Sequence, residues 1–473
     1  MKRLVSKFKR SAKTSKAAII VAEPATSDTD GPIPTINESV AETAEAERES
    51  TPNLKQSHDS KLERLPAEVR RQLLSILDLP RLKAVVRASP TFHQQYLFDR
   101  NYLLCTSLET TLDSVTVDAY AVSLYATRGK DTRQGWLLKL YSTRSSRQFL
   151  PLVGKLTPDE TLKIVLFYFQ LVKPLIEYYA RWTLDNLAEE VGKDACGQVA
   201  LTCMEKLRLT RAIYRFQLLC QVADPADTAL LSSREETVRA FLDLLEPWEI
   251  EELFSFYQFA QDVYDRALKD IRWHLQPHNP KFEDQRQPPT PEWAFILDNM
   301  SKLSYTLSYL LTLHTSNTQM TDRDNYLEGL TLRGVLLLHT VLFKIKDNKH
   351  LVSTIQQHMI SSYIPFNALE GVLGETQQAL RRENHPSDRD RMQEERAPLP
   401  FRGDRESDAP PLAWTTIWDD TYSNLYGWYI SDEMRRWGYV FWDAARIEGA
   451  GSKEFLKHQW GRCWEDDPRD DLI

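Results

Sequence analysis

Residues 65–96 read LPAEVRRQLLSILDLPRLKAVVRASPTFHQQY, and this stretch sets the main expectation for the fold. Three prolines divide it, namely Pro66, Pro80 and Pro90. Proline is favoured in the first turn of a helix, because the N–H group that it lacks would have no partner there. The stretch therefore predicts three short helices in succession, each beginning at or beside one of these prolines.

The apolar residues of the same stretch recur at three- and four-residue spacing, as on one face of each helix. Helices this short cannot enclose all of these residues among themselves. The excess must be covered either by the rest of the chain or by another protein, and the spacing is compatible with both. The residues expected to insert into a partner's groove are Leu65, Pro66, Val69, Leu73, Leu77, Leu79, Leu82 and Val85.

The order of residues in this stretch resembles an F-box. That family's pattern is Leu-Pro-x-Glu, a leucine-rich helix, a Leu-x-x-Leu turn and an ending similar to Val-Ser-x-x-Trp. This chain has LPAE at 65–68, LPRL at 79–82 and ASPTF at 88–92. Its ending carries alanine and phenylalanine where the family usually has a larger aliphatic residue and a tryptophan. Most of residues 60–448 also resembles F-box-like proteins of an uncharacterised filamentous-fungal type.

The resemblance implies that the chain is a substrate-recognition subunit of a cullin–RING ubiquitin ligase. Residues 65–96 would dock onto a Skp-type adaptor protein, and the helical domain would hold a target protein that the sequence does not identify. Each leucine that is well buried in the adaptor's groove could contribute roughly 1.5–3 kcal/mol. The alternative is a non-enzymatic helical scaffold or nuclear regulatory protein, in which the same helices are purely structural.

The rest of the chain is predicted to be helical, so the expected fold class is all-α, with a large irregular helical domain after the three-helix motif. Capping residues precede apolar residues at helical spacing, as in TPDETLKIVLFYF, where Thr157 and Glu160 form a capping box. Pro174 lies inside an otherwise helical pattern and should kink or split that helix.

Changes in composition predict the domain boundaries. A basic block followed by an acidic one, with little apolar material, predicts a disordered N-terminal arm. Its basic block leaves nuclear import, mitochondrial import, membrane-surface contact and a simple solvated arm as alternatives, and we expect a cytoplasmic or nuclear protein. The expected segments are the arm at 1–58, the F-box-like motif at 59–104, the helical domain at 105–371, a charged flexible linker or loop at 372–410, an aromatic-rich helical segment at 411–464 and an acidic tail at 465–473.

Ten aromatic residues lie between Trp414 and Trp442. Trp414, Trp418 and Tyr422 recur every four residues, as on one face of a helix. Such density is compatible with base stacking or with an aromatic ligand box, but Asp419 and its neighbouring acids would repel phosphates. We therefore expect these side chains to fill the core and to pack on the helical domain.

Several classes of function are disfavoured by the sequence. The formal net charge of −8 disfavours nucleic acid as a partner. No run of about 18 apolar residues predicts a membrane span. The five scattered cysteines form neither a disulfide framework nor a zinc pattern, so no metal is expected. No nucleotide-binding, hydrolase or metalloprotease motif occurs, and we expect neither enzymatic activity nor a cofactor.

Overall fold

In the computed structural model, the regular secondary structure of the described residues is helical. These residues contain one isolated β-bridge, between Pro398 and Thr421, and no β-strand. The prediction of an all-α fold is thereby confirmed. The predicted N-terminal arm, residues 1–58, lies outside the described residues. The structure describes residues 60–144, 151–192, 200–223, 231–275, 322–359 and 375–470.

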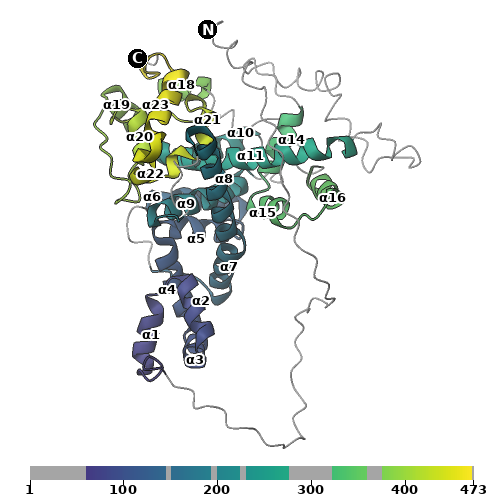
Figure 1. Ribbon diagram of the computed structural model, residues 1–473, viewed down its shortest axis with the longest axis vertical. Helices are drawn as coiled ribbons and strands as arrows, with labels where there is room; N and C mark the ends of the chain where they lie inside the picture. The colour runs from purple at the N-terminus through teal and green to yellow at the C-terminus, as the bar shows by residue number, and fades with distance from the viewer. Residues whose placement is uncertain are drawn as a thin grey trace, which may run out of the picture. The chain divides into compact units, whose positions relative to one another are not determined.

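The first three helices begin where the prolines predicted them to begin. They are α1 (Ala67–Ser75), α2 (Leu79–Ala88) and α3 (Pro90–Phe98), and all three contact α4 (Arg100–Leu112) (Figure 1). A hydrogen bond from the N–H of Leu79 to Thr111 Oγ1, 2.8 Å long, ties the start of α2 to α4. The three-helix motif is therefore joined to the rest of the fold by direct packing.

The helical body is built around α9 and α11, which pack against each other. Large side chains of both helices are fully buried, among them Phe216, Phe256 and Tyr264. Helix α11 is buried on nearly all sides in its first half, where even Glu251 and Glu252 are inaccessible to solvent. The helices of the body are α5 (Thr116–Tyr125), α6 (Lys130–Ser142), α7 (Pro158–Phe167), α8 (Lys173–Val191), α9 (Cys203–Val222), α10 (Leu231–Leu242), α11 (Pro247–Leu275), α14 (Asp322–Thr331), α15 (Val335–Phe343) and α16 (Asn348–Met359).

The predicted interruption at Pro174 is confirmed. A π-helical turn, Tyr168–Val172, separates α7 from α8, and Pro174 lies in the first turn of α8. The wider turn accommodates a residue that cannot donate a backbone hydrogen bond. At the other end of α7, the capping box of Thr157 and Glu160 forms as predicted.

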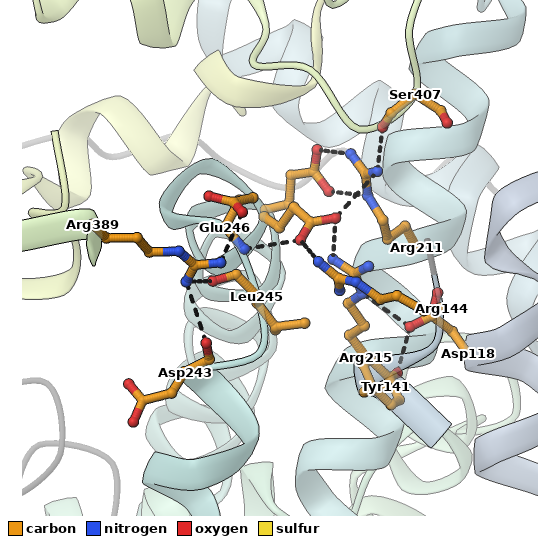
Figure 2. Close-up of polar contacts among 12 residues, drawn as sticks. Asp118, Tyr141, Arg144, Arg211, Arg215, Asp243, Leu245, Glu246, Arg389 and Ser407 are labelled. Atoms are coloured by element: carbon orange, nitrogen blue, oxygen red, sulfur yellow. Dashed lines mark hydrogen bonds and ion pairs between the residues drawn. The ribbon is translucent and has the colours of Figure 1, made fainter. Parts of the chain in front are cut away.

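The prediction of a charged flexible linker or loop at 372–410 is wrong for residues 375–394, which contain two helices, α18 (Glu375–Asn384) and α19 (Asp388–Glu394). Residues 395–410 contain no helix, as expected of a loop. Arg389 donates to the carbonyl oxygen of Leu245 at 2.6 Å and pairs with Glu246 at 2.7 Å (Figure 2). Arg389, one of the charges that suggested a solvated linker, is thus paired with groups of the helical body.

The aromatic-rich segment packs on the helical body through several short helices. Trp414 lies in edge contact with Trp248, with ring centroids 6.4 Å apart. Trp414, Trp418 and Tyr422 are all buried, but they do not share one helical face, because the helix ends at Ile417. The helices of this segment are α20 (Leu412–Ile417), α21 (Asp432–Arg436), α22 (Ala444–Glu448) and α23 (Ser452–Cys463).

The start of the predicted acidic tail also belongs to the packed structure. Arg469 is buried with its guanidinium 5.0 Å from the ring centroid of Trp418. It donates to the carbonyl oxygen of Tyr422 at 2.9 Å. The residues after α23 therefore cover the aromatic core as well as carrying charge.

Candidate functional site

The three-helix motif carries an unusual concentration of exposed apolar side chains. Among the residues whose side-chain exposure the structure describes, twelve large apolar residues are exposed, and five of them lie within residues 62–98. Soluble proteins seldom leave such groups together in water unless another surface covers them. This makes the motif the best candidate for a functional surface. We call these five residues the exposed apolar set: Leu62, Val69, Ile76, Leu97 and Phe98.

Two helices present most of the exposed apolar set. Val69 lies on α1, and Ile76 is the residue that caps its C-terminal end; they are seven residues apart, which places them on the same side of the helix. Leu97 and Phe98 end α3, and α1 contacts α3. The exposed fractions are 40% for Val69, 65% for Ile76 and 88% for Phe98.

The structure divides the eight residues predicted to insert into a partner. Pro66 and Val69 are exposed. The prediction is wrong for Leu79 and Leu82, which are 1% and 2% exposed, because α2 packs on α4 and places both side chains in the core. The remaining four are half-buried: Leu65, Leu73, Leu77 and Val85.

Sequence reasoning missed four members of the exposed apolar set. Ile76 could have been found, because it follows Val69 by seven residues, a spacing that returns to the same helical side. Leu97 and Phe98 end a helix in which only Phe92 is buried. Their exposure depends on where α4 turns away, which local spacing does not report. The fourth residue, Leu62, lies before α1 and belongs to no helical pattern.

Polar contacts hold the beginning of α1 in place. Arg70 donates to the carbonyl oxygen of Leu65 at 2.7 Å and to that of Glu63 at 3.1 Å. The hydroxyl of Ser89, which caps α3, donates to the Glu63 carboxylate. That hydrogen bond, together with one from the backbone of Ser60, lowers the pKa of Glu63. These hydrogen bonds connect residues 60–66 with α1 and with the start of α3. The segment that carries Leu62 and precedes Val69 therefore has a fixed position on the motif.

The charge around the exposed apolar set differs in sign from that of the whole chain. Residues 60–100 contain eight Lys or Arg and four Asp or Glu, whereas the complete chain has a net charge of −8. Some of these cations are engaged within the motif, as where Arg71 pairs with Asp99 at 3.3 Å. The local excess of positive charge favours a partner whose surface is acidic around an apolar groove.

A second concentration of functional groups lies inside the body, where Asp118, Tyr141 and three arginines meet (Figure 2). Arg215 contacts Asp118 at 2.9 Å, and the hydroxyl of Tyr141 donates to the same carboxylate at 2.5 Å. Arg211 contacts Glu252 through two nitrogens at 2.6 and 2.7 Å. These groups connect α5, α6, α9 and α11.

Glu249 lies at the centre of this buried network. Arg144 contacts it at 2.6 Å, Arg215 at 3.0 Å and Arg211 at 3.5 Å. Burial alone would raise the pKa of Glu249, but the three guanidinium groups outweigh that effect and hold its pKa well below the usual range. The Glu249 carboxylate is therefore charged at neutral pH, and its charge is balanced by the three guanidinium groups. These ion pairs connect α11 with α9 and with the residue Arg144 that follows α6.

Other kinds of site find little support in the described residues. There, no group of three or more His, Cys, Asp or Glu side chains could hold a metal ion. Within the same residues, no helix is both long and apolar enough to cross a bilayer. Comparisons with family models, curated proteins and solved structures found no match to this chain. The functional interpretation therefore rests on the residues themselves.

Proposed function

We propose that the chain is an F-box-type substrate-recognition subunit of a cullin–RING ubiquitin ligase. In this proposal α1–α3 dock onto a Skp-type adaptor, and the helical body with its aromatic segment holds a target protein. The observation that carries the proposal is the exposed apolar set, because these side chains are free to be covered by a partner. The F-box-like order of residues in 65–92 supports the same assignment.

The arrangement suits docking by a helix-in-groove mode. Leu74, Leu79 and Leu82 fix the motif on α4 from the inside. Val69 and Ile76 remain on the outside, where a groove could receive them. Each fully buried apolar side chain of this size contributes roughly 1.5–3 kcal/mol, so a few anchors offset the entropy lost on association. The inner and outer residues thus have separate roles.

The test is co-precipitation of the purified full chain with a purified Skp-type adaptor. The informative variant is Val69→Asp/Ile76→Asp, which places two charges where the groove would close and should reduce adaptor retention at least about tenfold. Leu336→Asp is the control, because Leu336 is an exposed apolar residue on α15, 59% exposed, which lies between the values of Val69 and Ile76. Circular dichroism of each variant checks that it is folded.

The proposal predicts retention by the wild type and by Leu336→Asp, and loss by the double variant. If neither wild type nor control retains the adaptor, the ligase assignment fails, and the motif is a structural element of a helical scaffold. Equal retention by all three proteins would place docking on another surface and contradict the role of the exposed apolar set.

A further inference from the structure

The helical body contains a pocket between α5, α7 and α9. Helix α5 contacts both of the other two (Figure 1), and all of the described residues that line the pocket lie on these three helices. The volume of the pocket is about 140 Å³. A cavity of roughly 150 Å³ in a protein interior can hold one benzene molecule. The pocket is therefore large enough for a ligand with a single six-membered ring.

Two polar groups of α9 line the pocket and lack partners. Tyr214 and Gln221 are seven residues apart, so they lie on the same side of α9. The Tyr214 hydroxyl and the Gln221 amide oxygen are buried without a hydrogen-bond partner among the described residues. Nε2 of Gln221 donates to the carbonyl oxygen of Val122 at 3.1 Å, which leaves the amide oxygen as the unpaired end. Burial raises the pKa of Tyr214, so its hydroxyl keeps its proton and can donate to a ligand.

The other walls of the pocket are largely apolar. Ala119 and Val122 of α5 line it, as do Ile164 and Phe167 of α7. The rings of Phe167 and Tyr214 lie 5.6 Å apart between centroids, so a ligand ring would meet aromatic neighbours. A buried water needs two to four polar partners, which these apolar side chains do not offer. An apolar group therefore suits this part of the pocket better than water does.

The charges at the edge of the pocket are balanced. Lys163 is exposed, and it is the one charged side chain among the described residues that line the pocket. Asp159 and Glu160 precede it by about one turn on α7. Hydrogen bonds from Thr157, together with the nearby charges of Lys163 and Arg128, lower the pKa of Glu160. Two cations and two carboxylates thus lie in this region, and a charged ligand would be desolvated in the pocket without a dedicated partner.

We infer that the pocket between α5, α7 and α9 binds a small uncharged aromatic molecule that carries one hydroxyl group and has about the size of phenol. Its ring would pack on Ile164 and Phe167. Its hydroxyl oxygen would accept from Tyr214, and its hydroxyl hydrogen would be available to the Gln221 amide oxygen. The inference goes beyond the proposed function and does not depend on it, because the pocket shares no described residue with α1–α3.

The test is saturation-transfer difference NMR of the purified full chain with phenol, toluene and benzoate, each titrated separately. Phenol and toluene have nearly the same shape, but toluene carries a methyl group in place of the hydroxyl. Benzoate carries a negative charge. We expect saturable binding of phenol, and benzoate should bind at least about tenfold more weakly because its charge must be buried.

The informative variant is Tyr214→Phe, which removes the unpaired hydroxyl and keeps the ring. We expect it to weaken phenol binding about fivefold and to leave toluene binding unchanged. A purely structural role of Tyr214 would weaken both ligands alike. The matched control is Tyr264→Phe, because Tyr264 on α11 is also fully buried with a hydroxyl that lacks a described partner, but it does not line the pocket.

A second variant, Ser123→Leu, fills the pocket from α5 and should weaken phenol and toluene binding at least about tenfold. Circular dichroism checks that each variant is folded. Four results would overturn the inference: no saturable binding of phenol by the wild type, equal weakening of phenol and toluene in Tyr214→Phe, the same loss in Tyr264→Phe, or undiminished binding in Ser123→Leu. If benzoate binds more tightly than phenol, the pocket recognises an anion and the assigned class of ligand is wrong.

Discussion

Replacing Glu249 by glutamine tests the physical account of the buried network most sharply. The carboxylate forms ion pairs with Arg144, Arg215 and Arg211, and it also accepts a hydrogen bond from the backbone N–H of Glu246 at 2.9 Å. Glutamine has almost the same shape but carries no charge and adds an N–H₂ group that faces guanidinium donors. The site would then hold three cations against two carboxylates.

We expect Glu249→Gln to lower the free energy of unfolding by about 3–5 kcal/mol, the usual cost of removing one partner of a buried ion pair. The effect should depend on pH. The pKa of Glu249 is depressed in the fold, so its stabilising contribution is fully present above the unfolded value of about 4.5 and is lost as the pH falls towards the folded value. The difference in the free energy of unfolding between wild type and variant should therefore become smaller below about pH 4.5.

The measurement is urea unfolding followed by tryptophan fluorescence between pH 3.5 and 7.5. Glu190→Gln, at an exposed position on α8, is the control and should lie within about 0.5 kcal/mol of wild type. A loss below about 1 kcal/mol in Glu249→Gln at pH 7 would show that the network contributes little. A difference that stays constant down to pH 3.5 would contradict the assigned charge of Glu249.

Two further predictions concern single residues. Gly403→Ala should destabilise the fold by about 1–3 kcal/mol, because a Cβ atom there collides with the carbonyl oxygen of Pro410. In Gly461→Ala, on α23, the added Cβ atom meets open space, so this variant should stabilise the fold by about 0.5–1 kcal/mol. Thermal unfolding of both variants checks this, and equal shifts would refute it. Burial raises the pKa of the Cys105 thiol, so at pH 8 an alkylating reagent should modify the exposed Cys203 much faster, as peptide mass spectrometry would show. Faster labelling of Cys105 would contradict its burial.

Local signals in the sequence were sufficient for the helices of the three-helix motif. Proline and capping residues act within one turn of the chain, which is why the starts of α1–α3 and the break at Pro174 were predictable. The inner face of the motif was not predictable in the same way. Leu79 and Val69 both lie at positions of the apolar helical pattern, so the sequence does not distinguish them. Leu79 is buried because α2 packs on α4, whereas Val69 stays exposed.

The charged stretch before the aromatic segment shows why long-range pairing escapes local reasoning. Its density of charge resembled a solvated linker, but Arg389 reaches groups more than 140 positions earlier in the chain. Arg208 on α9 likewise donates to the carbonyl oxygen of Gly403 at 2.8 Å. Such partners are defined by the tertiary fold, so the composition of either segment alone cannot reveal them.

The most direct test of the docking surface is the protection of one side chain by the adaptor. In the full chain, Ile76→Cys is a small change at an exposed position, and its rate of alkylation can be followed by peptide mass spectrometry with and without a saturating Skp-type adaptor. Leu336→Cys on α15 is the control. The account predicts that the adaptor slows alkylation at position 76 at least about tenfold and leaves position 336 unchanged. If the rate of alkylation at position 76 is the same with and without the adaptor, the claim that α1–α3 form the docking surface is contradicted. This holds whether the adaptor binds elsewhere on the chain or does not bind at all.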